Sequence, residues 1–155
     1  MPTAADRTRE AERLRHGVNR LARLMRHQDD GDLGATSTAA LATVRKRGPL
    51  TLGELASSEQ VSPPTMTKVV EKLESHGFVT RRVDPDDRRV ARVTVTTVGT
   101  RYLDRTRARR TEWLAGRLGD LEPQQVAQLA GAIELLEAII GEPDCRPEAA
   151  ARRPR

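Results

Sequence analysis

The feature that most restricts the fold of this chain is the order of local signals in residues 51–96, where two short helices precede two β-branched runs. The first helix is predicted to begin at Thr51, because a threonine N-cap with Glu54 three residues later satisfies two backbone donors that a helix leaves unpaired. One side of this helix is apolar through Leu52, Leu55 and Ala56. Such a helix has to pack its apolar side against another element.

The second helix of this stretch is predicted over residues 62–76. Ser62 suits its N-cap, Pro63 suits the first helical position, and Gly77 suits the residue that ends it. Apolar residues recur at helical spacing, namely Met66, Val69, Val70 and Leu73. Short hydroxyls and cations on the other sides can reach phosphates and base edges in a major groove. The residues expected to do so are Ser62, Pro64, Thr65, Thr67 and Lys68.

The β-branched runs predict a hairpin, the wing, over residues 78–95. Its strands are expected at 78–83 and 90–95, and residues 84–89 between them are of the types that turns prefer. Arginines at the tip of a narrow ribbon can enter a minor groove, and an aspartate can orient them by ion pairing. The residues expected in these roles are Asp87, Arg88 and Arg89, while Arg81, Arg82 and Arg92 are expected to extend the positive surface.

By itself, a polar helix face or a charged turn does not indicate a binding site, because exposed polar side chains are ordinarily just hydrated. The order helix, turn, helix and ribbon favours nucleic-acid binding, because it is the order of a winged helix-turn-helix. The formal net charge of +5 favours a polyanionic partner. DNA is expected and not RNA, since A-form RNA hides its major groove from a helix.

Three segments of the chain resemble the MarR family of bacterial transcriptional regulators: residues 48–56, 61–68 and 84–89. The wing signature of the family, Asp-x-Arg followed by Val-x-Leu-Thr, falls on Asp87, Arg89, Val93, Val95 and Thr96, with Val95 in place of the usual leucine. The resemblance implies a homodimer that binds double-stranded DNA, with a recognition helix in the major groove. It also places Arg89 in the adjacent minor groove, with Arg88 beside it.

The resemblance further implies regulation, expected here as repression at a pseudo-palindromic promoter site. It implies a cleft between the winged domain and the dimer helices, where many relatives take small aromatic or anionic effectors. No cofactor and no metal are expected, and the sequence does not name the effector. Redox sensing by Cys145 is disfavoured, because this cysteine lies in a tail that is predicted to be disordered.

The predicted fold class is mainly α with a small β-wing. Residues 1–30 are expected to hold an N-terminal dimerisation helix, 36–96 the winged DNA-binding domain, 97–140 the C-terminal helices that complete the dimer, and 141–155 a disordered tail. Two apolar stripes in steps of three and four favour dimer packing over simple capping of the central domain. They are Leu14, Val18, Leu21 and Met25 in the first helix, and Val126, Leu129, Ile133, Leu136 and Ile140 in the last.

The winged domain is expected to open with a helix over residues 36–46, with Thr36 or Ser37 at its N-cap. Capping is the ordinary role for such residues, but a helix N-terminus can also hold a phosphate. Thr36, Ser37 and Arg82 therefore complete the residues expected to contact DNA.

Two other classes of function fit the sequence less well. An enzyme is not expected, because no nucleophile motif or phosphate-binding glycine loop appears and none of the three histidines has a companion at metal-ligand spacing. A winged-helix module that binds protein would need an apolar or acidic outer face on the second helix, which instead carries Lys68 and Lys72. That module and a non-specific DNA-binding protein are the alternatives to a sequence-specific regulator.

The chain is expected to be cytoplasmic, without a membrane partner. No apolar run approaches the roughly 20 residues that cross a bilayer, and the first residues lack the apolar segment of a signal peptide.

Overall fold

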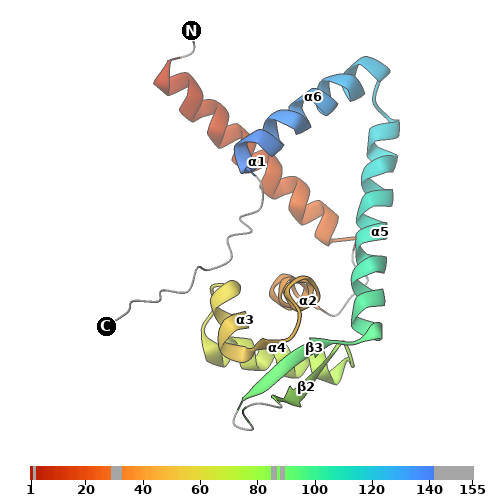
Figure 1. Cartoon of the computed structure of the whole chain (residues 1–155). Helices are drawn as coiled ribbons and strands as arrows, with labels where there is room; N and C mark the ends of the chain where they lie inside the picture. Colours follow the sequence, from red (N-terminus) through yellow and green to blue (C-terminus); the bar gives the residue numbers. More distant parts are fainter. Residues whose placement is uncertain (2, 29–32, 85–86, 88–89, 142–155) are drawn as a thin grey trace. The chain divides into compact units, whose positions relative to one another are not determined.

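The computed structural model describes residues 1, 3–28, 33–84, 87 and 90–141 of the chain. The described residues are mostly helical, with one small antiparallel sheet, as the sequence predicts (Figure 1). In chain order the elements are α1 (Ala4–Arg26), α2 (Ala35–Arg47), β1 (Leu50–Thr51), α3 (Leu52–Ser58), α4 (Pro63–Ser75), β2 (Val79–Val83), β3 (Ala91–Val95), α5 (Thr97–Gly119) and α6 (Pro123–Ile140). The chain divides into two compact units, Met1–Leu114 and Ala115–Arg155.

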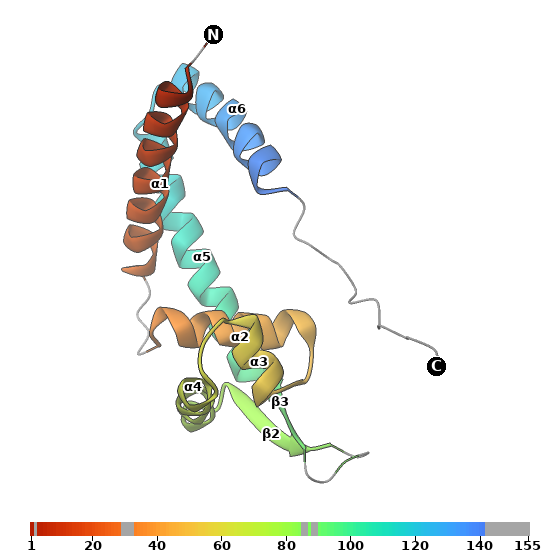
Figure 2. The ribbon, with the colours of Figure 1, turned by 90° about the vertical axis from the view of Figure 1, so that its left-hand side faces the viewer.

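The hydrophobic core lies where α2, α3 and α4 pack together against the sheet (Figure 2). Its largest fully buried side chains come from all of these elements: Leu41, Val44, Leu55, Met66, Val70, Leu73 and Val93. Apolar surface removed from water in this way contributes about 25 cal/mol per Å². Most of this core therefore comes from residues 36–96, called here the winged segment, and Leu33 and Leu103 add to it from outside that range.

Helix α2 begins earlier than the sequence indicated. Its N-cap is Gly34, whose extended backbone (φ −67°, ψ 166°) lets its carbonyl accept a hydrogen bond from the Thr38 N–H at 3.1 Å. The prediction of Thr36 or Ser37 at the N-cap was therefore wrong. The reason lies in packing, because Ser37 shares the buried face of the helix and is only 6% exposed, so the helix must already have begun there.

The predicted start of α3 is confirmed. The Thr51 hydroxyl accepts a hydrogen bond from the Glu54 N–H at 3.2 Å, and the Glu54 carboxylate accepts one from the Thr51 N–H at 2.8 Å. Together they form the expected capping box. After α3 the chain turns through Gln60, which has a positive φ of 53°, and a hydrogen bond from the Val61 N–H to the Ala56 carbonyl closes the turn.

The limits predicted for α4 are also confirmed. Ser62 is the N-cap residue and Pro63 the first helical residue, while Gly77 follows the helix with a φ of 69°. Only a residue without a Cβ adopts that conformation at little cost. The Phe78 N–H donates back to the Leu73 carbonyl at 2.9 Å, which directs the chain from the helix into β2.

The sheet has the strand order β1-β3-β2, and both pairs are antiparallel. In the predicted hairpin, Thr80 lies opposite Thr94 and Arg82 lies opposite Arg92. Strand β1, which pairs Leu50 with Val93, was not predicted. It consists of two residues, too few to show a period-two pattern.

Helix α5 is fastened to the end of α4 by Thr96. The Thr96 hydroxyl accepts a hydrogen bond from the Gly99 N–H at 3.0 Å and donates one to the Gly77 carbonyl at 2.7 Å. A Cβ on Gly99 would lie 2.2 Å from the Phe78 carbonyl oxygen, so only glycine fits this approach. The rings of Phe78 and Tyr102 stack at a centroid distance of 4.6 Å, so the first turns of α5 are held against the winged segment.

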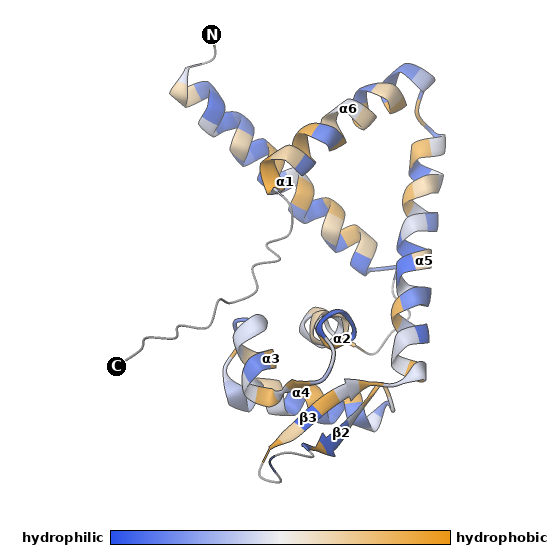
Figure 3. Cartoon of the chain, in the orientation of Figure 1, coloured by the Kyte–Doolittle hydropathy of each residue, from blue (hydrophilic) through white to orange (hydrophobic). Residues whose placement is uncertain are grey.

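The first and last helices keep apolar side chains exposed. Hydrophilic and apolar residues alternate along both α1 and α6 (Figure 3). In α1, Leu14 is 42% and Val18 49% exposed, and in α6, Ile133 is 45% and Ile140 76% exposed. Each predicted stripe is therefore helical, and most of its side chains are exposed among the described residues.

Candidate nucleic-acid interface

The N-terminal end of α4 presents a polar surface made of Ser62, Pro63, Pro64, Thr65 and Lys68, all of which are exposed. Because the two prolines carry no N–H, the first backbone donor of the helix belongs to Thr65. The Ser62 side chain does not cap this end of the helix, and its hydroxyl lies 2.8 Å from the Thr65 hydroxyl instead. An uncapped N–H at the positive end of a helix dipole, next to two hydroxyls and an ammonium, is suited to a phosphate.

One further residue predicted at this surface, Thr67, is less exposed than the others. Thr67 is half-buried, and its hydroxyl donates to the Pro63 carbonyl at 3.0 Å. That bond uses its donor and leaves its oxygen as an acceptor. The opposite face of α4 is anchored in the core by Met66, Val70 and Leu73, so the rigid helix fixes the direction in which Lys68 projects.

The wing contributes Arg82, which is exposed on the strand β2. Arg88 and Arg89, the predicted tip arginines, lie outside the described residues. The ion pair predicted between Asp87 and one of these arginines therefore stays a prediction. Asp87 is half-buried, and its carbonyl accepts a hydrogen bond from the Val90 N–H at 2.9 Å, which closes the far end of the hairpin.

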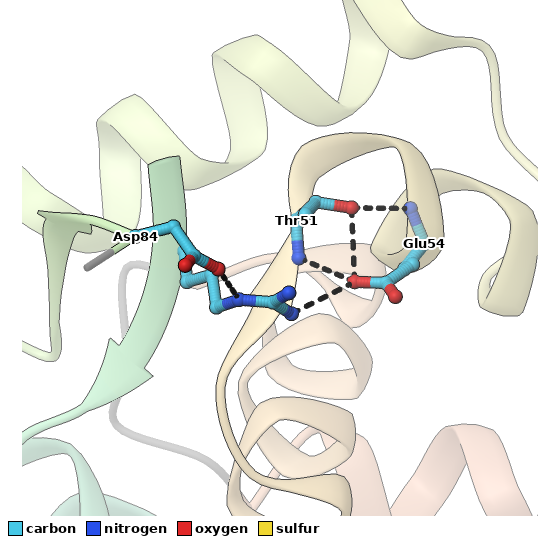
Figure 4. A network of polar contacts seen from close by, with 4 residues as sticks. Thr51, Glu54 and Asp84 are labelled. Atoms are coloured by element: carbon cyan, nitrogen blue, oxygen red, sulfur yellow. Dashed lines mark hydrogen bonds and ion pairs between the residues drawn. The ribbon is translucent and has the colours of Figure 1, made fainter. Parts of the chain in front are cut away.

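Arg92 forms part of a polar network that the sequence did not reveal (Figure 4). Its Nε donates to the carboxylate of Asp84, whose side chain is 10% exposed, and its Nη1 lies 3.7 Å from the carboxylate of Glu54. Hydrogen bonds from the Thr51 N–H and hydroxyl, together with the nearby charge of Arg92, lower the pKa of Glu54. The network therefore joins the N-terminus of α3 to strand β3 of the wing and to Asp84, the residue that follows β2.

This pairing corrects two of the arginine predictions. Arg92 was expected to extend the positive surface, but its charge is neutralised by two carboxylates. Arg81 was expected to do the same, but its Nε lies 2.9 Å from the Glu74 carboxylate of α4. Arg81 also points inward, because alternate residues of a strand face opposite sides and its neighbour Arg82 is the exposed one. Both paired arginines hold the wing in place.

The start of α2 gives a mixed result for the two residues predicted there. Thr36 is exposed in the first turn of α2. Ser37 is buried in the core. A phosphate contact through the Ser37 side chain does not fit this position, whereas Thr36 is accessible to one.

A pocket of about 290 Å³ lies within the first unit, between the end of α1, the helix α2 and the middle of α5. Its apolar lining comes from Met25, Ala42, Leu103 and Leu114, and its polar lining from Thr38, Arg45, Thr106, Arg107, Arg110 and Thr111. Arg45 is held at its edge by an ion pair with Asp104 at 2.6 Å. Apolar walls with cations at the rim suit a small molecule that has an apolar body and a negative group.

Other kinds of site are not found in the part of the chain that the structure describes. Within it, no three His, Cys, Asp or Glu side chains cluster as metal ligands would. Among the described helices, none combines the length and apolar character that crossing a membrane requires.

Comparison with known proteins identifies the family. Residues 33–91 match the MarR family. An HTH-type transcriptional regulator from Mycobacterium tuberculosis is 36% identical over 135 residues, which cover 86% of this chain and 94% of the relative. The chain belongs to the MarR family, and it is a transcriptional regulator with a DNA-binding winged helix, not an enzyme.

Solved structures agree with this assignment. A transcriptional regulator from Pseudomonas aeruginosa superposes with a TM-score of 0.79 at 30% identity, covering 90% of this chain and 98% of the other. A mutant of MepR from Staphylococcus aureus, solved bound to an oligodeoxyribonucleotide, superposes with a TM-score of 0.68 at 16% identity, covering 85% and 98%. The second likeness supports the fold alone.

Proposed function

We propose that this protein is a sequence-specific regulator that binds a pseudo-palindromic promoter site as a homodimer in the cytoplasm, and that it acts as a repressor released by a small ligand. The observation that carries the proposal is the N-terminal end of α4, where Ser62, Thr65 and Lys68 are exposed on a helix whose other face is locked in the core. A rigid helix with its donors directed outward can read base edges in a major groove. A protein of the same fold, the MepR mutant, was solved bound to an oligodeoxyribonucleotide.

Dimerisation is supported by the exposed apolar faces of α1 and α6. Side chains such as Ile133 and Ile140 are exposed to water, and a second copy that presents the same faces could cover them. Removing their apolar surface from water would contribute favourable free energy to association. A two-fold axis would place two copies of α4 in successive major grooves about 34 Å apart. The operator would then have two half-sites with that spacing.

Release by a ligand is supported by the pocket lined by α1, α2 and α5. A small aromatic anion could place its ring against Leu103 and Leu114 and its charge near Arg45 or Arg107. Because α5 is fastened to α4 through Thr96, a ligand that shifts α5 would also shift the recognition helix. Such a ligand acts only if it binds the two arrangements with different affinity.

The test is a titration of the purified protein against DNA from upstream of its own gene and against scrambled DNA of equal length, at two salt concentrations. Selective binding to the upstream DNA is expected. Lys68→Ala should weaken it and, if Lys68 contacts a base, relax the preference at one operator position. Glu71→Ala, on the same helix, is the matched control because it removes an anion and should not weaken binding. Equal affinity for both DNAs would contradict the proposal and favour a non-specific DNA-binding protein.

Repression and release need a separate measurement. Transcription from the bound promoter in vitro should fall as protein is added and recover when a small aromatic anion such as salicylate is supplied. Recovery should be lost in Leu103→Trp, which fills the pocket. Stimulated transcription would reverse the proposed sign of regulation, and an unchanged response in the filled variant would remove the pocket from the mechanism.

A further inference from the structure

The second half of α1 carries a cluster of basic side chains, and this cluster lies outside the winged domain. This basic patch comprises His16, Arg20, Arg23 and Arg26. Together with the neutral side chain of Asn19 they line a shallow concavity, and all five residues are exposed. Within the described residues, its three arginines form no ion pair with a carboxylate. Neighbouring cations on a helix repel one another, so an anion that bound here would relieve that repulsion.

The basic patch lies on the opposite side of α1 from its apolar stripe. The stripe starts at Leu14 and the patch at His16, and two residues turn about 200° around a helix. Both then recur in steps of three and four, so they stay opposite along the helix. A partner that covers the apolar stripe therefore leaves the basic patch in water.

The length of the patch favours a polyanion over a single small anion. Arg20 and Arg26 are six residues apart, which is about 9 Å along a helix. Duplex DNA carries one negative charge per roughly 1.7 Å of its axis, so about five phosphates lie within that length. Guanidinium groups donate two parallel hydrogen bonds to a phosphate, which suits all three arginines to this role.

We propose that the basic patch of α1 is a second DNA-binding surface, which contacts the phosphate backbone in addition to the contacts made by α4 and the wing. The inference rests on DNA being the partner, and it does not depend on operator selectivity. In the sequence, three acidic residues follow the patch, Asp29, Asp30 and Asp32, and they lie outside the described residues. Contacts of this kind add affinity without adding sequence preference.

The experiment compares two charge-matched triple variants of the full chain. The patch variant is Arg20→Gln, Arg23→Gln and Arg26→Gln. The control variant is Arg7→Gln, Arg101→Gln and Arg105→Gln, which removes three exposed arginines that make no ion pair among the described residues. Circular dichroism and sedimentation establish that both keep the fold and the assembly state of the wild type. Affinity is then measured across a salt series on a duplex trimmed to the operator and on one with long flanks.

The patch variant should bind at least one of the two duplexes about tenfold or more weakly than the control variant near 0.1 M salt. Its slope of log affinity against log salt should be smaller by about 0.9 for each phosphate that the protein no longer neutralises. Weaker binding to the long duplex alone would place the patch against flanking DNA. Equal affinities and slopes for the two variants on both duplexes would overturn the inference.

Two further results distinguish this inference from the proposed function and from binding of an acidic protein. If the wild type shows no operator preference, the proposed function fails, but the salt slopes on any long duplex still test the patch. Poly-glutamate that bound the wild type as tightly as DNA, and lost its affinity in the patch variant alone, would assign the patch to an acidic protein and overturn the DNA assignment.

Discussion

The winged segment and the terminal helices of this chain differ in how far their apolar side chains are buried. In the winged segment, Leu55 and Met66 are fully buried in the core. In α6, Leu135 and Ile139 are 68% and 74% exposed. The winged segment carries its own source of stability, whereas the terminal helices leave apolar surface exposed that a partner could bury. This contrast separates the DNA-binding winged helix from the helices that we propose set the assembly.

The largest expected effect follows from the core of the winged segment. Leu55→Ala should lower the free energy of unfolding by about 2–5 kcal/mol, because it removes buried contacts and leaves a cavity. Urea denaturation followed by circular dichroism measures this change. Leu135→Ala is the matched control, and it should leave the unfolding of the winged segment unchanged. Equal losses in the two variants would remove the contrast between the regions.

A smaller effect is expected on assembly. Ile133→Asp on α6 should raise the dissociation constant of the proposed dimer roughly a hundredfold, because a charge would have to be buried at the interface in both copies. Analytical ultracentrifugation over a concentration series measures it, with Glu134→Gln as the control on the next residue. A wild-type protein that sediments as a monomer at every concentration would contradict the proposed dimer.

The polar network at the base of the wing predicts a pH dependence. The pKa of Glu54 is lowered in the folded chain, so the stability it contributes is present above its unfolded pKa and is lost as the pH falls through its folded pKa. Between about pH 5 and pH 3 the wild type should therefore lose more stability than Glu54→Gln, whose amide does not titrate there. Urea midpoints at a series of pH values from neutral down to about pH 3 measure the difference. Parallel curves for the two proteins would show that the network does not contribute.

The smallest effect distinguishes two adjacent arginines of the wing. Arg82→Gln should weaken DNA binding several-fold, a change of about 1 kcal/mol, with little change in stability, because Arg82 is exposed. Arg81→Gln should instead lower stability by about 1 kcal/mol or less through loss of its partly exposed pair with Glu74. Fluorescence anisotropy with labelled DNA and thermal melts measure the two quantities. The reverse pattern would mean that the strand faces are assigned wrongly.

Much of the fold could be predicted because its signals are local. The capping box of Thr51 and Glu54, the proline at the start of α4 and the positive φ of Gly77 each depend on residues within one turn of a helix. The hairpin follows from β-branched runs around a turn. The outward-facing residues of α4, such as Lys68, then follow from the helical period, because its apolar residues fix which side is buried.

The sites that sequence reasoning missed depend on residues that are distant in the chain. Strand β1 exists because Leu50 pairs with Val93, and Gly99 is required because the Phe78 carbonyl approaches it. The resemblance implied a cleft between the winged domain and the dimer helices, but it named none of its residues. The pocket between α1, α2 and α5 brings together Met25, Ala42 and Leu103, which no local pattern connects.

The sequence by itself determined the order of the elements, where most of them begin and end, and which face of α4 is polar, because helix caps, turns and periodicity act within a few residues. Only the tertiary structure decided which arginines keep their charge available for DNA. Arg81 and Arg92 are held by Glu74, Asp84 and Glu54, whereas Arg82 and the arginines of the basic patch are not paired with a carboxylate among the described residues. The reason is that an ion pair forms between side chains that the fold brings within about 4 Å, wherever they stand in the chain.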